Sequence, residues 1–270
     1  MVASHTTSKQ LWEAYQDLKS TQKVAERFGC KKSSVLNCLK KNGYKLNQLI
    51  KYSCNEYFFE QNTSESFYWA GFIAADGCVK KRKSYKDNFR YELQIGLSKK
   101  DKFHIEKFKS YINYNGPIRD YLVKNSKRNL KWNDSWKSEL TINSKQIFND
   151  LVKFNVVPRK SLIYTFPEWL VDHPLVHHFM RGYFDGDGSF YFCKYKNKAS
   201  QEYFSLRGTT EFLNTYRDIL ERENLVIKRD KPIRINSNIG VLEYGGNCVV
   251  KSIKEYLRDD SDLKLDRKWI

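Results

Sequence analysis

Two aspartates occupy the same place in two similar stretches of the sequence. Asp76 is the eighth residue of 69–77 (WAGFIAADG), and Asp187 is the eighth residue of 180–188 (MRGYFDGDG). Each stretch is predicted to be an apolar helix, rich in small residues, that ends at Asp-Gly. A carboxylate in the last turn of a helix faces the negative end of the helix dipole, which is locally unfavourable. Its occurrence in both stretches predicts a nearby cation, most simply a divalent metal ion.

Small residues recur one helical turn apart in both stretches, as in Gly71 with Ala75 and Gly182 with Gly186. Residues four apart share one helix face, so the pattern favours close packing of the two helix backbones. The two aspartates would then lie side by side and repel each other unless a cation lay between them. This predicts a shared site with oxygen ligands suited to Mg²⁺. Two ordinary buried helices, each followed by an Asp-Gly turn, are the alternative, but they leave the duplication unexplained.

The same order of predicted elements follows each stretch. In the first half these are strands 79–85 and 89–97, helix 100–112, strands 118–123 and 136–142, and helix 144–154. In the second half they are strands 189–195 and 203–207, helix 210–222, strands 233–236 and 241–244, and helix 247–257. Each half is thus αββαββα, and the predicted fold class is α+β. We expect two related subdomains, 64–172 and 173–270, each with a four-stranded antiparallel sheet.

Residues 1–47 have a different sequence pattern from the rest of the chain and are predicted to form a small, all-α helix-turn-helix DNA-binding domain. Ala25, Gly29 and Val35 have the spacing that lets two short helices cross closely around a tight turn. The second of these helices, 32–41, would be the recognition helix. A generic three-helix bundle with a basic, solvated face is the alternative. The candidate DNA contacts are Lys31, Lys32, Ser33, Ser34 and Asn37.

Residues 48–63 are aromatic rather than rich in Gly and Ser. They are predicted to be a linker that docks on the main domain instead of a free tether.

The two stretches resemble the nonapeptide motif of the LAGLIDADG homing endonucleases, in the form that carries two motifs on one chain. The resemblance covers roughly residues 50–270 and implies two subdomains joined by the motif helices. In that family the eighth motif position is the metal-binding acid, which corresponds to Asp76 and Asp187. The carbonyls at the seventh position, here those of Ala75 and Gly186, also contact metal in such a site.

The sixth motif position is Ala74 in one copy and Asp185 in the other. An acid there is therefore dispensable, and Asp185 is interpreted as structural or supportive. The family also has a basic residue near each active site, which organises solvent or stabilises charge on phosphate. We assign this catalytic role to Lys160 and Lys268, which lie near the ends of the two halves. A helix cap or a phosphate anchor is the alternative for each lysine.

The balance of charge favours a polyanion as partner. The 270 residues include 48 Lys and Arg against 31 Asp and Glu, a net charge of +17. Ribosomal and membrane-surface proteins can be as basic, so charge alone does not decide the class. No apolar run approaches the ~20 residues that span a bilayer, and no signal-peptide core is present at the N-terminus. We expect an intracellular protein: cytoplasmic, bacterial or phage-encoded, or organellar.

The six cysteines form no C-x-x-C pair, so neither zinc binding nor a disulfide framework is indicated.

The predicted hairpins offer polar surfaces for DNA. A twisted two-stranded ribbon fits the major groove, and alternation sends one set of side chains to the groove and the other to the core. The candidate contacts are Lys80, Arg82, Arg90, Gln94 and Arg119 in the first half, and Lys194, Lys196, Gln201, Arg207, Arg234 and Asn236 in the second. Two different halves predict an asymmetric site of roughly 20 bp at ~10.5 bp per turn.

Residues and resemblance together predict a monomeric, site-specific homing endonuclease. It would make metal-dependent double-strand breaks in a long, asymmetric double-stranded DNA target and promote the mobility of an intron or of its own gene. The expected cofactor is Mg²⁺, with Mn²⁺ or Ca²⁺ able to substitute for binding, and no membrane partner is expected. The resemblance implies cuts across the minor groove with a short 3′ overhang. An RNA-splicing maturase or a non-catalytic DNA-binding regulator on the same scaffold is the alternative; an intein is disfavoured because no C-terminal His-Asn is present.

Overall fold

The chain divides into two units, Met1–Ser53 and Cys54–Ile270. The computed structural model describes residues 6–18, 20–44, 46, 52–83, 89–124, 134–194, 199–228, 232–236, 238–258 and 261–269. The candidate residue Lys196 and the first part of the predicted linker, 48–51, lie outside these ranges. Within them, no helix combines the length and the apolar character that a membrane crossing requires.

The smaller unit consists of three short helices, α1 (Ser8–Leu18), α2 (Thr21–Arg27) and α3 (Lys32–Lys41). Ser20 caps α2 by accepting a hydrogen bond from the Lys23 amide at 3.4 Å. The chain then turns at Gly29, whose φ of +60° is a conformation that glycine adopts without strain. The helices share one apolar core, formed by Leu11, Ala14, Tyr15, Val24, Ala25, Val35, Leu39 and Leu46.

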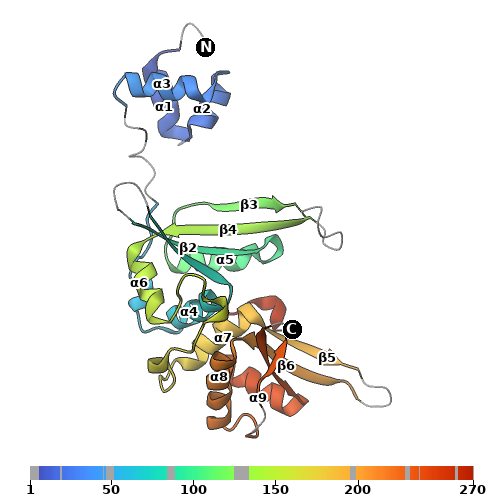
Figure 1. Ribbon diagram of the computed structural model, residues 1–270. Helices are drawn as coiled ribbons and strands as arrows, with labels where there is room; N and C mark the ends of the chain where they lie inside the picture. Colours follow the sequence, from blue (N-terminus) through green and yellow to red (C-terminus); the bar gives the residue numbers. More distant parts are fainter. Residues whose placement is uncertain are drawn as a thin grey trace. The chain divides into compact units, whose positions relative to one another are not determined.

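The larger unit repeats one arrangement twice, as the sequence predicts, and the α+β fold class is confirmed (Figure 1). The first half contains α4 (Ser64–Asp76), β1 (Gly77–Lys83), β2 (Phe89–Ser98), α5 (Lys102–Tyr111), β3 (Ile118–Val123), β4 (Ser135–Asn143) and α6 (Lys145–Lys153). The second half contains α7 (Val176–Asp187), β5 (Gly188–Cys193), β6 (Gln201–Gly208), α8 (Thr210–Arg222), β7 (Arg234–Asn236), β8 (Ile239–Gly245) and α9 (Asn247–Arg258). Short 3₁₀ turns at Phe58–Glu60, Lys99–Asp101, Lys160–Leu162, Glu168–Leu170 and Asp266–Lys268 complete the described elements.

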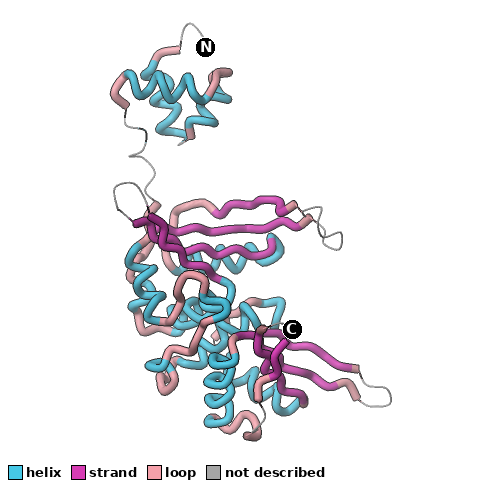
Figure 2. Tube along the Cα trace, in the orientation of Figure 1, coloured by secondary structure: helices cyan, strands magenta, loops and turns pink. Residues whose placement is uncertain are grey.

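The two sheets have the same topology. Their strand orders are β1-β2-β4-β3 and β5-β6-β8-β7, and every neighbouring pair is antiparallel. The equivalent register pairs Gly77 with Ile95 and Gly188 with Leu206, so each first strand begins where its motif helix ends. Figure 2 shows the two sheets on either side of the central helices.

Helices α4 and α7 form the join between the halves. Figure 1 shows α4 in teal and α7 in yellow next to each other. Almost all of α4 is buried, including the run from Ser66 to Ala74, because it packs against its own half and against α7. Its N-terminus is closed by a capping box in which Thr63 and Ser66 exchange side-chain hydrogen bonds with each other's amides at 3.3 Å.

Glycine makes this close contact possible. A Cβ atom on Gly71 would overlap the carbonyl oxygen of Phe179, and one on Gly182 would overlap the carbonyl oxygen of Tyr68. Since those neighbouring atoms belong to main chain, they cannot give way by changing rotamer. The predicted packing of small-residue faces is therefore observed as backbone-to-backbone contact, and it fixes the two helix ends relative to each other.

Candidate active site

The two predicted metal-binding aspartates end the two joined helices. Asp76 is the last residue of α4 and Asp187 the last residue of α7. The position of a Cβ on Gly186 lies 3.3 Å from the backbone nitrogen of Asp76, so the two helix ends are in contact. Both aspartate side chains keep exposed surface, which leaves them within reach of water and ions.

The surroundings of the aspartates disfavour their negative charge. Burial by the neighbouring chain raises the pKa of Asp76, and the ammonium groups of Lys268 and Lys160 oppose this rise. The pKa of Asp187 rises to about 6, first because of burial and then because the Asp76 carboxylate is near. A buried carboxylate whose pKa is raised further by a neighbouring carboxylate is a typical setting for a bound cation.

Each helix end is also capped by one of the predicted catalytic lysines. Lys160 donates hydrogen bonds from Nζ to the carbonyls of Ala75 at 3.2 Å and Gly77 at 2.9 Å. Lys268 donates from Nζ to the carbonyls of Gly186 at 2.7 Å and Phe184 at 3.3 Å. Burial lowers the pKa of both lysines, while the nearby aspartates oppose the change. The two lysines therefore have equivalent places, as the repeat predicts.

The charges are arranged crosswise between the halves. Among the aspartates of the two helix ends, Asp187 exerts the stronger pull on Lys160, and Asp76 exerts the stronger pull on Lys268. Each lysine thus donates hydrogen bonds to the helix end of its own half. Of the two aspartates, it interacts more strongly by charge with the one from the other half. The four side chains and the two helix ends form one continuous group.

The residues present fit a hard divalent cation. Mg²⁺ usually keeps several waters and takes one or two carboxylates together with substrate phosphates. Asp76 and Asp187 supply two such carboxylates, and a cation there would offset the burial of both and the effect of Asp76 on Asp187. The carbonyls of Ala75 and Gly186 each accept a lysine hydrogen bond and retain a second lone pair for a metal ion. The described residues contain no group of three or more His, Cys, Asp or Glu side chains that could hold a metal ion, at the helix ends or elsewhere.

Asp185 lies two residues before Asp187 on α7 and has a different environment. It is fully buried, and burial raises its pKa while hydrogen bonds from Tyr68, Leu265 and Trp269 lower it. These donors approach its carboxylate oxygens at 2.7, 2.7 and 2.6 Å, respectively. With its lone pairs used in this way, Asp185 is a structural anchor and not a solvent-facing ligand.

In the first sheet the register places all five predicted DNA contacts on one face. Lys80, Arg82, Arg90 and Gln94 lie on one side of β1 and β2 because they are an even number of residues apart along each strand and pair in register, and Arg119 lies on the same face through its pairing in β3 and β4. Arg82 and Arg90 lie directly opposite each other across the two strands. Lys80 donates a hydrogen bond to Gln94.

A carboxylate sits among these basic groups. Glu92 has a side chain only 11% exposed, and its Oε atoms lie 2.9 Å from Arg90 Nε and 3.5 Å from Arg82 Nε. Like charges opposite each other in a sheet are destabilising. The Glu92 carboxylate offsets the repulsion between Arg82 and Arg90. It also limits the orientations of their guanidinium groups.

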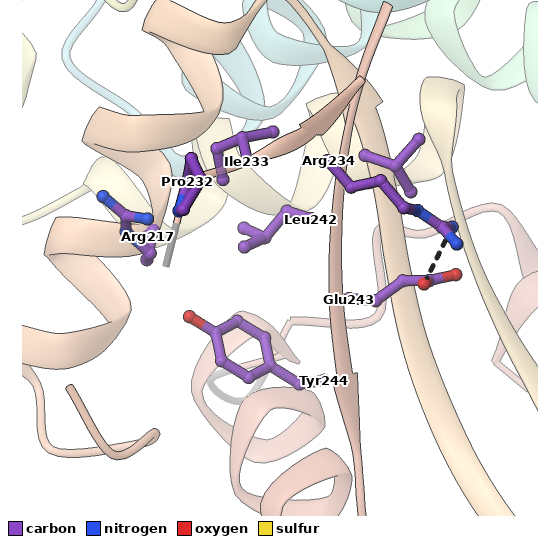
Figure 3. Close-up of a pocket in the computed structure, with 8 residues that line it drawn as sticks. Arg217, Pro232, Ile233, Arg234, Leu242, Glu243 and Tyr244 are labelled. Atoms are coloured by element: carbon purple, nitrogen blue, oxygen red, sulfur yellow. Dashed lines mark hydrogen bonds and ion pairs between the residues drawn. The ribbon is translucent and has the colours of Figure 1, made fainter. Parts of the chain in front are cut away.

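In the second sheet the corresponding face has a different chemistry. Gln201, Arg207, Arg234 and Asn236 lie on it, and Lys194 is exposed just after β5. Arg234 makes an ion pair with Glu243 at 2.9 Å, which Figure 3 draws as a dashed line. The rings of Tyr191 and Tyr203 stack at 5.4 Å on the same face, where the first sheet has Lys80 and Glu92.

The hollow in Figure 3 is separate from the aspartates. None of the predicted catalytic residues lines it. Its lining consists of one residue of α8, the end of β7 with the two residues before it, and part of β8: Arg217, Pro232, Ile233, Arg234, Val241, Leu242, Glu243 and Tyr244. The candidate active site is therefore defined by the two helix ends and not by this hollow.

In the smaller unit, the predicted contacts of helix α3 lie mainly at its surface. Lys31, Lys32, Ser33 and Asn37 are exposed, and Ser34 is half-buried. Val35 and Leu39 on the opposite side of the helix are fully buried. The helix is therefore amphipathic, with a basic and polar outer face.

Sequence reasoning missed three polar residues that the structure brings into play. Glu92 was missed because an acidic residue in a basic strand does not by itself indicate that it will form ion pairs with two arginines. Tyr68, before the first motif, looked like a core aromatic but donates its hydroxyl proton to Asp185. Arg181 did carry a signal: it is a charged residue at a motif position where the first copy has Ala70.

No protein-family model and no curated protein matches the sequence. Among solved structures, the homing endonuclease I-WcaI bound to its DNA recognition sequence is 18% identical, with 86% of this chain and 96% of that chain covered and a TM-score of 0.55. The LAGLIDADG homing endonuclease I-GzeII in complex with its DNA target is 14% identical, with coverage of 73% and 84% and a TM-score of 0.47. The likeness to I-WcaI shows that this chain shares the homing-endonuclease fold over most of its length.

Proposed function

Because the chain has the two-subdomain fold of the LAGLIDADG homing endonucleases, we propose that it is a site-specific, metal-dependent endodeoxyribonuclease. It cuts both strands of a long, asymmetric DNA target. One observation carries the proposal: Asp76 and Asp187 end two helices that touch through their backbones, and each helix end carries a lysine ammonium group. Acidic and basic groups at one exposed site suit hydrolysis of a phosphodiester.

The two aspartates would hold Mg²⁺, together with the carbonyl oxygens of Ala75 and Gly186. A bound metal ion polarises phosphate oxygens, lowers the pKa of water and stabilises the leaving oxygen. Burial and, after it, the nearby Asp76 carboxylate raise the pKa of Asp187 to about 6, which supports this assignment. It means that the site binds cations more readily than an isolated carboxylate would.

The two lysines supply fixed positive charge next to the scissile phosphates. Lys160 and Lys268 are held by main-chain carbonyls, so their ammonium groups need little reorganisation when a phosphate approaches. Their lowered pKa also makes each ammonium a better proton donor to a developing oxyanion. A phosphate would therefore meet preorganised charge on both sides of the helix join.

The outer faces of the two sheets would bind the flanking DNA. The first face presents Lys80, Arg82 and Arg90, and the second replaces much of this charge with stacked tyrosines, so the two half-sites differ in sequence. Helix α3 of the smaller unit would act as the recognition helix of a helix-turn-helix and extend the contacts beyond one end. Both motifs are on one chain, so a monomer suffices for cleavage. Cutting a defined site would promote the mobility of an intron or of the gene itself.

Sequencing of cut ends from a randomised DNA library incubated with the purified protein and Mg²⁺ tests the proposal directly. We expect one family of asymmetric sites of roughly 20 bp, each cut on both strands with a short 3′ overhang. EDTA should abolish cutting. Blunt or random ends, or no cutting with Mg²⁺ or Mn²⁺, would contradict the proposal.

Charge-removing variants test the assignment of the acids. Asp76→Asn and Asp187→Asn should each abolish double-strand cleavage while retaining DNA binding in a filter assay. Asp218→Asn is the matched control, because this aspartate is exposed on α8 and belongs to neither helix end. It should cut like the unmodified protein. An Asp76→Asn variant that still cuts both strands would exclude Asp76 as a catalytic ligand.

A further inference from the structure

The segment that carries Lys268 is tied to α7 by a buried arginine. Arg181 is fully buried, and its guanidinium donates to main-chain carbonyls of the segment 257–263. Nη1 donates to Leu257 O at 2.7 Å and Nε to Leu263 O at 3.0 Å. Nη2 donates to Ser261 Oγ at 3.0 Å. The guanidinium thus holds both the end of α9 and the chain that leaves it.

Asp185, one turn further along α7, holds the next part of the same segment. Its Oδ2 accepts the amide of Leu265 at 2.7 Å, and its Oδ1 accepts the indole Nε1–H of Trp269 at 2.6 Å. These two donors lie on either side of Lys268 in the chain. The hydroxyl of Tyr68, from the first half, also donates to Oδ2 at 2.7 Å. The carboxylate therefore fixes the short turn Asp266–Lys268 from both ends.

The first half has nothing equivalent on its motif helix. Ala70 and Ala74 occupy the positions that correspond to Arg181 and Asp185, and neither has a polar side chain. Lys160 nevertheless reaches its two carbonyls, from a chain that follows α6. The two lysines thus have equivalent positions but different supports.

We propose that Arg181 and Asp185 are positioning residues for Lys268, and for Lys268 alone. They hold residues 257–258 and 261–269 on α7 so that the Lys268 ammonium stays at the Gly186 carbonyl beside the aspartates. This inference adds to the proposed nuclease function, on which its cleavage test rests. Its consequence is an asymmetry: disturbing this pair impairs one of the two cuts and spares the other.

The first test needs neither DNA nor metal. Acylation of lysines by a water-soluble succinimidyl ester, followed site by site with mass spectrometry, reports how tightly each ammonium is held. Asp185→Asn leaves one acceptor oxygen for three donors, so the segment should loosen. We expect Lys268 to react roughly fivefold faster or more, with Lys160 unchanged as the control within the same molecule. Equal change at both lysines, or none at Lys268, would overturn the inference.

The second test separates the two cuts. On a supercoiled plasmid with one target site, Asp185→Asn should accumulate nicked circles, because one strand is cut roughly 10- to 100-fold more slowly. Val250→Ala is the matched control: it removes buried volume from α9 without touching the bonds of Arg181 or Asp185. It should give the normal ratio of nicked to linear product.

A gentler variant covers the case in which Asp185→Asn does not fold. Trp269→Phe keeps the ring packed on Phe184 and Phe190 and removes only the indole donor. It should show the same selective acylation and the same nicked product, to a smaller degree. If the unmodified protein cuts no DNA, the proposed function fails, while the acylation result still decides the positioning role. Cleavage by the unmodified protein with equal slowing of both cuts in the variant would reject the positioning role alone.

Discussion

Replacing Asp187 by asparagine should make the metal-free protein more stable. Its carboxylate pKa is raised from 3.8 to about 6 by burial and by Asp76, so ionising it at neutral pH weakens the folded state. A rise of this size corresponds to about 3 kcal/mol as an upper bound. The side chain is exposed, however, and solvent screens such charges strongly. We therefore expect Asp187→Asn to raise the free energy of unfolding by about 1 kcal/mol.

The pH dependence has a definite sign. Asp187 has a higher pKa when folded than when unfolded, so the folded state binds more protons between pH 4 and about 6. The destabilisation is fully present above pH 6 and disappears as the pH falls toward 4. The advantage of Asp187→Asn should accordingly be found at pH 7.5 and be nearly lost at pH 4. Millimolar Mg²⁺ at pH 7.5 should reduce it too, by stabilising the unmodified protein.

Urea unfolding in EDTA, followed by circular dichroism, measures the effect. A gain of about 1 kcal/mol moves the midpoint by about 0.4 M if the slope is near 2.5 kcal/mol/M. Asp218→Asn, which removes an exposed charge from α8, should move it little. If Asp187→Asn were as stable as or less stable than the unmodified protein at pH 7.5, burial and Asp76 would not be opposing the charge of Asp187, and the basis for the cation site would fall.

Two further outcomes follow from the geometry. Gly182→Ala should lower the free energy of unfolding, measured by urea titration, by about 3 kcal/mol, since the new methyl group meets the Tyr68 carbonyl. Gly96 has open space around it, so Gly96→Ala should leave that free energy nearly unchanged. Alkylation of exposed Cys78, which follows the first helix end on β1, should slow DNA cleavage roughly tenfold or more by obstructing the phosphate. Cys78→Ser should make cleavage resistant to maleimide even though Cys248 still reacts, and loss of activity in that variant would contradict the placement.

Much of the fold could be predicted because it depends on periodic patterns. The order αββαββα followed from alternation in the strands and from the two copies of one motif, and helix α8 and strand β3 begin and end where predicted. The close contact of α4 with α7 was predictable from Gly71 and Gly182, since glycine in a helix is costly without such a purpose.

Long-range polar contacts could not be predicted in the same way. The three donors to Asp185 are Tyr68 of α4, the amide of Leu265 and the indole of Trp269, which lie 117, 80 and 84 residues from it in the sequence. No local pattern indicates which of them will meet. Glu92 was missed for a similar reason: its role depends on strand register, which pairs Arg82 with Arg90 and brings both within reach of the Glu92 carboxylate.

The backbone contact at Gly71 and Gly182 also fixes the distance between the two helix ends. Side chains on the sheets can be exchanged one at a time as a target sequence drifts, but the spacing of the two helix ends depends on main-chain atoms that no such exchange alters. The proposed nuclease could therefore change the sequence that it recognises while the stagger between its two cuts stays constant. Recognition and cutting geometry are thus free to evolve separately.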